Sequence, residues 1–261
     1  MSPEGLGGNV TAAERFALAL RRHGVELLFG QSIPSQIHLA AEAMGMRQIA
    51  YRTENAGAIM ADGFARISGR VPVVTAQNGP AATLLVPPLA EALTASIPLV
   101  ALVQDVPRGN LDRNAFQELD HLELFKGCAK WVRRVAVSAR IDDYVDMAFA
   151  AAASGRPGPA VLLCPLDLIG EVGVAASARG ATLGHYPLDR SVADPAQVAA
   201  AARLLAEARA PLLVAGGGVH SSGATQALAR LQQDFALPVA TTAMGKGAVD
   251  EGHPLSLGVI G

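Results

Sequence analysis

The stretch PLVALVQDV at residues 98–106 consists largely of apolar and β-branched residues. Shorter runs of the same kind recur along the chain, at 25–29, 49–53, 71–76, 131–137, 160–163, 211–215 and 238–242. Strands buried on both faces of a parallel sheet have this composition, whereas half-exposed strands alternate apolar and polar residues. Helix-sized segments with apolar residues at i, i+3 and i+4 lie between most of these runs. The sequence therefore predicts an α/β fold in which helices flank a mostly parallel sheet.

The chain changes character near its middle. A segment rich in Gly, Ala and Ser covers residues 170–184, and Asp194-Pro195 then supplies an N-cap and a proline for a new helix. The last part shows two clear strand-like runs where a domain sheet has about 5–6 strands. We therefore predict a pair of domains, the second of them an incomplete, truncated Rossmann-like α/β unit. The predicted boundaries are a first domain over 1–170, a linker over 171–190 and the second unit over 191–261.

The composition excludes several classes of protein. Lys and Arg total 21 and Asp and Glu total 23, so the net charge of −2 provides no basic surface for nucleic acid or anionic lipid. No apolar run approaches the roughly 18 residues of a membrane span, and the N-terminus lacks the pattern of a secretory signal. Cys128 and Cys164 form neither a disulfide framework nor a metal-site spacing. We expect a cytoplasmic protein with no membrane or nucleic-acid partner.

Glu54 is the first candidate functional residue. Ligands in open parallel sheets bind beyond the carboxyl ends of the strands, and Glu54 follows the predicted strand over 49–53. It opens a predicted helix over 55–67, in which small residues would let another surface approach closely. A carboxylate at a helix start is also favoured by the helix dipole, by at most about 1 kcal/mol. The local pattern alone therefore leaves Glu54 either a helix-start residue or a functional carboxylate.

A series of motifs carries more information than any single one. In order along the chain, these are YRTENAGAIMADGFARISG at 51–69, VVT at 73–75 with Gly79-Pro80, AFQELD at 115–120, KW at 130–131, RPGPAV at 156–161, GGG at 216–218, MGKG at 244–247 and HPLSLG at 253–258. The series resembles the pyrimidine-binding domain of thiamine-diphosphate-dependent enzymes of the acetolactate synthase group, followed by the start of their central domain. The resemblance covers nearly the whole chain and implies the thiamine-diphosphate-binding fold for residues 1–170.

The resemblance also implies roles for matching residues. Glu54 matches the catalytic glutamate that hydrogen-bonds N1′ of the cofactor's aminopyrimidine and thereby activates the cofactor for nucleophilic attack. Gly79 and Pro80 match a turn that packs near the pyrimidine. Gln117 matches a glutamine that faces both cofactor and substrate, and Phe116 matches its apolar neighbour on the substrate side.

Plainer interpretations stand beside these assignments. Gly79-Pro80 is also an ordinary helix-start turn, and Gln117 could begin a surface helix. Lys126 and Lys130 are candidates to attract the carboxylate of a 2-oxoacid substrate, although solvated lysines are commoner. We interpret the scattered histidines, His121 among them, as structural, and the cysteines as buried small hydrophobic residues.

The diphosphate-binding part of the family's site has no match in this sequence. The family holds the diphosphate and Mg²⁺ through a Gly-Asp-Gly motif, which does not occur here, and Mg²⁺ needs oxygen ligands of that kind. We therefore expect the diphosphate and Mg²⁺ site to lie in a missing C-terminal part or in a second subunit. The resemblance implies an oligomer, either a homo-oligomer or a two-subunit enzyme. It leaves open whether FAD binds in the central domain.

The sequence thus predicts the pyrimidine-binding half of a lyase or synthase that decarboxylates a pyruvate-like 2-oxoacid and ligates the product to a second carbonyl. Departures from the family pattern, such as Phe64 and Ala81, leave the substrate's identity open. An alternative is a non-catalytic subunit that regulates or stabilises a full-length relative. A nicotinamide-binding domain fits less well, because Ser221 and Gly223 follow GGG and do not complete the fingerprint G-x-G-x-x-G.

Overall fold

The computed structural model describes residues 10–175 and 179–260. The chain divides into two compact units, Met1–Leu188 and Asp189–Gly261. Each unit is built on a parallel sheet with helices, so the predicted α/β class is confirmed. No helix in the described part of the chain combines the length and the apolar character of a membrane span.

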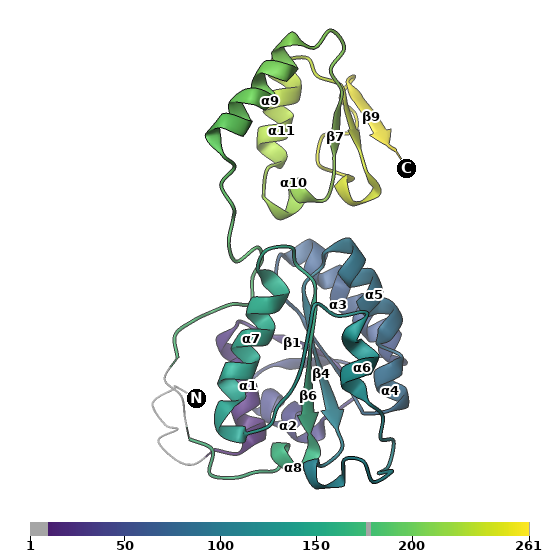
Figure 1. Ribbon diagram of the computed structural model, residues 1–261, viewed down its shortest axis with the longest axis vertical. Coiled ribbons are helices and arrows are strands. Elements are labelled where there is room, and N and C mark those ends of the chain that lie inside the picture. The colour runs from purple at the N-terminus through teal and green to yellow at the C-terminus, as the bar shows by residue number, and fades with distance from the viewer. Residues whose placement is uncertain (1–9, 176–178, 261) are drawn as a thin grey trace. The chain divides into compact units, whose positions relative to one another are not determined.

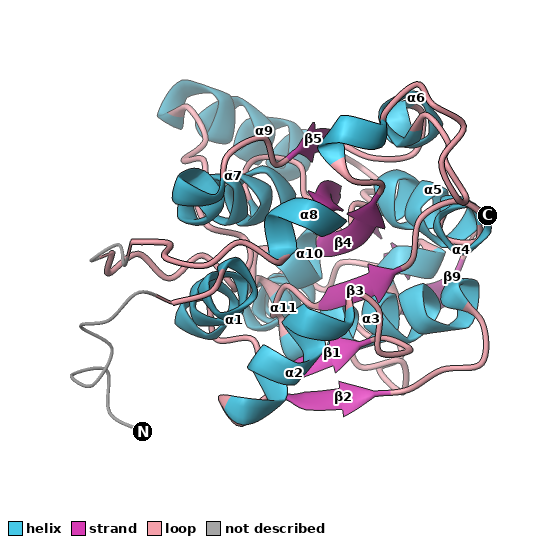
Figure 2. Cartoon of the chain, turned by 90° about the horizontal axis from the view of Figure 1, so that it is seen from below, coloured by secondary structure: helices cyan, strands magenta, loops and turns pink. Residues whose placement is uncertain are grey.

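The first unit is built on six parallel strands in the order β2-β1-β3-β4-β6-β5 (Figures 1 and 2). Every residue of β3, β4 and β6 is buried, which explains why these segments are apolar almost throughout. The strands are β1 Leu27–Phe29, β2 Arg47–Ile49, β3 Val73–Ala76, β4 Leu99–Asp105, β5 Trp131–Arg134 and β6 Pro159–Pro165.

Helices cover both faces of this sheet. Alternate residues of β4 point to opposite sides, so that Val100 and Leu102 enter one hydrophobic core while Ala101 and Val103 enter the other. The first core is covered by α1 Ala12–Arg22, α2 Ser35–Ala43, α7 Ile141–Ala153 and α8 Leu166–Ile169. The second is covered by α3 Glu54–Ser68, α4 Pro80–Thr83, α5 Val86–Ala95 and α6 His121–Lys126. The 3-10 turns η2 Arg108–Asn110 and η3 Ser138–Arg140 lie in the connections.

The segment before the second unit is folded onto the first. The N–H of Val71 donates to the carbonyl of Gly184 at 2.8 Å, and the hydroxyl of Tyr186 donates to the carbonyl of Ala65 at 2.7 Å. The first unit therefore runs to Leu188 and includes most of the stretch 171–190 that the sequence predicts to be a linker. Residues 176–178 of that stretch lie outside the described part.

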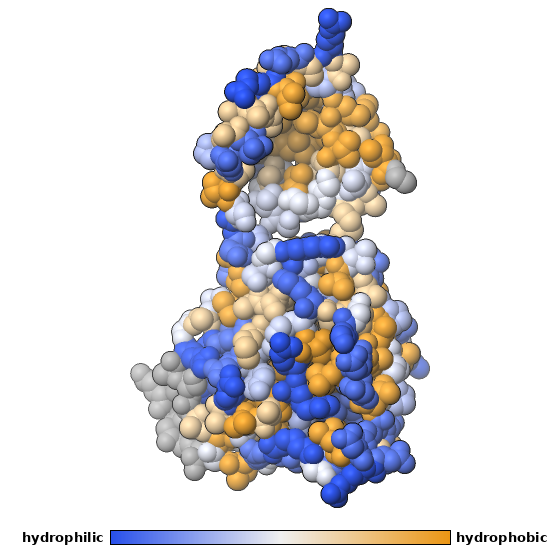
Figure 3. All heavy atoms as spheres, in the orientation of Figure 1, coloured by the Kyte–Doolittle hydropathy of each residue, from blue (hydrophilic) through white to orange (hydrophobic). Residues whose placement is uncertain are grey.

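The second unit has a small parallel sheet in the order β7-β8-β9. Its strands are β7 Leu213–Ala215, β8 Val239–Thr241 and β9 Ser256–Val259, and its helices are α9 Pro195–Glu207, α10 Gly218–Ser221, α11 Thr225–Asp234 and the 3-10 turn η4 Ala243–Gly245. The sequence predicts two strands, and β9 adds a third in a short run that Gly258 interrupts. Val214 and Leu257 are about half exposed, and Figure 3 shows apolar side chains gathered over β7 and β9.

Candidate functional site

The candidate site lies at the carboxyl edge of the first sheet. Because all six strands are parallel, the loops after β1, β2, β3 and β4 emerge at the same edge. β1 leads into α2 on one face of the sheet, whereas β3 leads into α4 and α5 on the other. Open α/β sheets bind ligands where such a change of face leaves a crevice between neighbouring strands.

The turn after β3 is in direct contact with Gln117. Gly79 has φ 66° and ψ −124°, a conformation that residues with a side chain rarely adopt. A Cβ built on Gly79 would lie 2.7 Å from both the Cβ and the carbonyl oxygen of Gln117, so no side chain fits there. Pro80 follows as the first residue of α4. The structure thus brings Gly79, Pro80 and Gln117 together.

The side chain of Asn78 joins the segment around Gln117 to this turn by hydrogen bonds. Its side-chain amide donates to the carbonyl oxygens of Phe116 at 2.9 Å and Gln117 at 3.1 Å. Its Oδ1 accepts a hydrogen bond from Nε2 of Gln104 at 3.3 Å. The side chain of Phe116 is 79% exposed, so backbone hydrogen bonds rather than packing of the ring anchor this segment.

Three hydrogen-bonded side chains, those of His121, Asp105 and Arg134, support the same turn. The N–H of Gly79 donates to Nε2 of His121 at 2.9 Å, and Nδ1 of His121 lies 3.1 Å from Oδ1 of Asp105. Arg134 donates its Nε–H to Oδ2 of Asp105 at 2.5 Å. The side chains of His121 and Asp105 are fully buried. Burial raises the pKa of Asp105, but the hydrogen bonds from His121 and Arg134 outweigh it, so this pKa lies below its ordinary value.

We expect the change Asp105→Asn to lower the free energy of unfolding by about 1.5–3 kcal/mol at pH 7, the contribution of a hydrogen bond to a charged group. Because the pKa of Asp105 is depressed in the folded protein, the stabilisation is complete above the ordinary aspartate pKa of about 3.9 and is lost as the pH falls below it. Urea unfolding followed by the fluorescence of Trp131, the single tryptophan, measures this. A difference between the two proteins that stays constant into acid would contradict the assignment.

Glu54 begins α3 at this edge of the sheet. Nearby, the ring of Tyr51 packs against Gly57, and its hydroxyl donates to the carbonyl of Thr75 in β3. Burial, with a smaller contribution from the charge of Glu54, raises the pKa of Tyr51. The carboxylate of Glu54 is half-buried and accepts no hydrogen bond from the residues that the structure describes.

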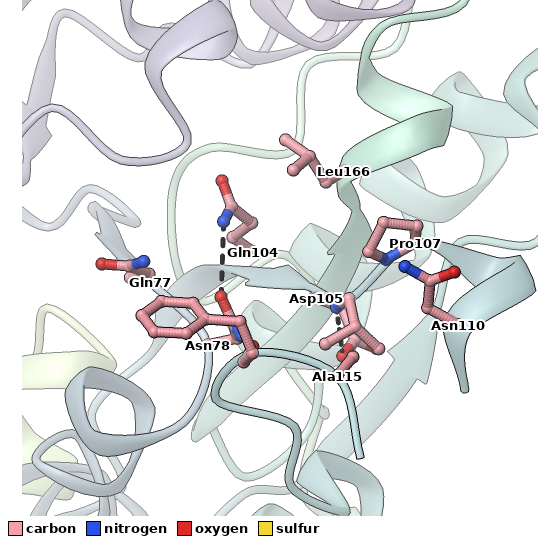
Figure 4. Close-up of a pocket in the computed structure, with 10 residues that line it drawn as sticks. Gln77, Asn78, Gln104, Asp105, Pro107, Asn110, Ala115 and Leu166 are labelled. Atoms are coloured by element: carbon pink, nitrogen blue, oxygen red, sulfur yellow. Dashed lines mark hydrogen bonds between the residues drawn. The ribbon is translucent and has the colours of Figure 1, made fainter. Parts of the chain in front are cut away.

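A pocket of about 250 Å³ opens at the same edge (Figure 4). Side-chain amides and apolar groups form most of its surface, while the Asp105 carboxylate is already bound by His121 and Arg134. The pocket therefore offers hydrogen-bonding amides beside an apolar wall. Its lining residues are Gln77, Asn78, Gln104, Asp105, Val106, Pro107, Asn110, Ala115, Phe116 and Leu166.

Lys130 does not join the other predicted site residues. Its backbone N–H donates to the carbonyl of Pro159, the first residue of β6, at 2.8 Å. Because β5 and β6 are parallel, Lys130 lies at the amino edge of the sheet, opposite the candidate site. Its Nζ donates to the carbonyl of Ser154 at 2.7 Å. The structure therefore does not bring Lys130 together with Gly79 and Gln117, and its proposed attraction for a 2-oxoacid carboxylate stays a prediction.

Several residues of the site were not among those predicted. Asn78 directly precedes Gly79, and Gln104 and Asp105 end the longest apolar run, so polar residues at strand ends were the available signal. His121 carried no such signal and was interpreted as structural. The place of His121 in the site depends on Gly79 and Asp105, which lie elsewhere in the sequence.

A parallel sheet with a glycine turn and a buried polar cluster at its carboxyl edge is the arrangement in which open α/β domains bind ligands. Residues 10–124 match the family model described as "Thiamine pyrophosphate enzyme, N-terminal TPP binding domain". Residues 198–261 match the model described as "Thiamine pyrophosphate enzyme, central domain". The chain therefore belongs to the thiamine pyrophosphate enzyme family.

Curated relatives agree with this assignment. The chain is 38% identical over 261 residues to a protein of Arthrospira platensis named "Acetolactate synthase", covering 97% of this chain and 45% of the relative. It is 38% identical over 255 residues to "Probable acetolactate synthase large subunit" of Methanocaldococcus jannaschii, covering 95% and 43%. It is 34% identical over 248 residues to "Acetolactate synthase, chloroplastic" of Arabidopsis thaliana, covering 93% and 37%. The chain thus spans less than half the length of these relatives.

Proposed function

We propose that this chain contributes the aminopyrimidine-binding half of a thiamine-diphosphate-dependent active site, together with the first part of a central domain. The observation that carries the proposal is the contact between Gly79 and Gln117 at the sheet edge where Glu54 begins its helix. The diphosphate and Mg²⁺ would be held by a further segment of the protein or by a partner subunit. We use the term assembled protein for this chain together with that further segment or partner subunit.

The residues at this edge fit the aminopyrimidine. Because Gly79 has no side chain, Gln117 packs directly on the turn, and its Oε1 is buried without a hydrogen-bond partner in the described structure. A buried acceptor of this kind is costly unless a ligand supplies a donor, and an aminopyrimidine carries N–H donors. For Mg²⁺ the case differs: residues 10–175 and 179–260 contain no cluster of three or more His, Cys, Asp or Glu side chains that could hold a metal ion.

Glu54 would bind the ring nitrogen N1′ of the aminopyrimidine. A carboxyl group can hold a proton at that atom and release it again, whereas an amide of the same shape cannot. When bound, thiamine diphosphate supplies a nucleophilic carbon and an electron sink for decarboxylation. The task of this chain would be to orient the ring through Gly79, Pro80 and Gln117 and to hold the proton through Glu54.

For the reaction, we propose that a pyruvate-like 2-oxoacid loses CO₂ and that the remaining fragment is joined to the carbonyl carbon of a second substrate. The names of the relatives, acetolactate synthase and its large subunit, support this class of reaction. The term large subunit also supports an oligomer or a partner subunit. Phe116 would lie on the substrate side of the site.

Titration of thiamine diphosphate into the assembled protein with Mg²⁺, followed by a CO₂-release assay with pyruvate, tests the proposal. We expect saturable binding, and CO₂ release that requires the cofactor. Binding without turnover on any 2-oxoacid would favour the non-catalytic subunit. Absence of binding would contradict the proposal as a whole.

A further inference from the structure

We propose that His121 is a positioning residue of the site described above. Asp105 holds the imidazole of His121, and Nε2 of that ring accepts the hydrogen bond from the N–H of Gly79. The imidazole thereby sets the surface that the turn and Gln117 present to the aminopyrimidine. The inference rests on the proposed function. Among the hydrogen bonds of the described structure, the imidazole of His121 binds a single residue of the pocket lining, Asp105.

The hydrogen bonds assign the tautomer of His121. The backbone N–H of Gly79 can donate but cannot accept, so Nε2 of His121 must offer it a lone pair. In the neutral ring the hydrogen then lies on Nδ1, which faces Oδ1 of Asp105 at 3.1 Å. Asp105 is itself held by Nε of Arg134 at 2.5 Å and by the backbone N–H of Val106 at 3.0 Å. The imidazole is therefore fixed in both orientation and tautomer.

His121 completes a set of attachments between one short segment and the Gly79 turn. Asn78 binds the carbonyl oxygens of Phe116 and Gln117, and the backbone of Gln117 lies against the α-carbon of Gly79. A few residues further along the chain, at the start of α6, His121 binds the N–H of Gly79. The turn is thus held from the ligand side by Gln117 and from the buried side by His121.

The hydrogen bond to Nε2 matters because it pairs a buried N–H at a residue with an uncommon backbone conformation. Its N–H is buried, and without His121 it would lose its partner, which favours rotation of the peptide away from φ 66° and ψ −124°. Any such rotation moves the α-carbon on which Gln117 packs. The buried Oε1 of Gln117 would then shift relative to the ring that it is proposed to meet.

A pair of substitutions separates this role from packing alone. In His121→Gln the side-chain Oε1 reaches the position of Nε2 and can accept from Gly79, whereas in His121→Asn the amide reaches the position of Nδ1 and can bind only Asp105. Both remove the imidazole ring and create a similar packing defect. We expect His121→Asn to bind thiamine diphosphate about 10- to 100-fold more weakly than His121→Gln, the factor that an orphaned buried amide represents.

The measurement is calorimetric titration of thiamine diphosphate into the assembled wild-type and variant proteins at saturating Mg²⁺, with unfolding followed by circular dichroism. Equal weakening in both variants, or weaker binding by His121→Gln, would overturn the inference while the proposed function stands. Failure of the wild-type protein to bind thiamine diphosphate would overturn the proposed function, and the inference with it.

Nitrogen NMR of the unsubstituted chain, labelled at its histidines, provides a second test that does not depend on whether the variants fold. We expect His121 to carry its hydrogen on Nδ1 and a lone pair on Nε2. A ring with hydrogen on Nε2, or on both nitrogens at neutral pH, is incompatible with the bond to Gly79 and would overturn the inference.

Discussion

Turnover by the assembled protein is expected to fall about 10²–10⁴-fold when Glu54 is replaced by Gln, the range over which a positioned acid–base group contributes. The amide keeps the shape of the side chain but cannot exchange a proton with a ring nitrogen. Because Glu54 begins α3 and accepts no hydrogen bond from the described residues, the change should leave folding nearly unaffected. The rate of CO₂ release from pyruvate at saturating cofactor measures the effect.

Glu42→Gln is the matched control for this substitution. Glu42 is an exposed carboxylate near the end of α2, so the same change of charge there should leave turnover as it is in the unsubstituted protein. If Glu54→Gln also left turnover intact in an active assembly, the catalytic role of Glu54 would be refuted. That outcome is the one that a non-catalytic subunit predicts.

Gly79→Ala is expected to lower the free energy of unfolding by about 2–6 kcal/mol. Part of this loss is the strain of a side chain at φ 66° and ψ −124°, about 1–3 kcal/mol. The rest is steric, because the new Cβ would lie 2.7 Å from atoms of Gln117, and overpacking costs about 1–3 kcal/mol. Since the turn and Gln117 must separate to admit the methyl group, we also expect thiamine diphosphate binding to be lost.

Gly69→Ala separates strain from steric overlap. Gly69 also has a positive φ, 67°, but an added Cβ there meets nothing within 4 Å. A cost of about 1–2 kcal/mol from the left-handed conformation is expected, with unchanged cofactor binding. Equal losses of stability in the two alanine variants, together with retained cofactor binding by Gly79→Ala, would show that Gln117 does not pack on the turn as described.

The sheet and its helices could be predicted from the sequence because their signals are local. Strands such as β4 and β6 are buried at every position, and a buried strand has to be apolar at every position. Glu54 was likewise predicted at the start of its helix, although the strand before it, β2, ends at Ile49 and not at residue 53. The third strand of the second unit was not predicted, because β9 is short and alternates partly buried and exposed residues.

The site could be predicted in part. Gly79 and Gln117 were identified through motifs, but their contact depends on loops that neither periodicity nor propensity describes. The hydrogen bond from Asn78 to Phe116 spans 38 positions, and that from Gly79 to His121 spans 42. Lys130 was proposed from its charge alone, and its position before β5 places it at the opposite edge of the sheet from Gln117.

The central claim is that the edge carrying Glu54, Gly79 and Gln117 binds the aminopyrimidine. Its most direct test is an experimental structure of the assembled protein with thiamine diphosphate and Mg²⁺. The account predicts the Glu54 carboxylate within about 2.6–3.2 Å of N1′, the range of a direct hydrogen bond, with the ring against Gly79 and Gln117. An aminopyrimidine bound elsewhere, with Glu54 facing solvent or another side chain, would contradict it.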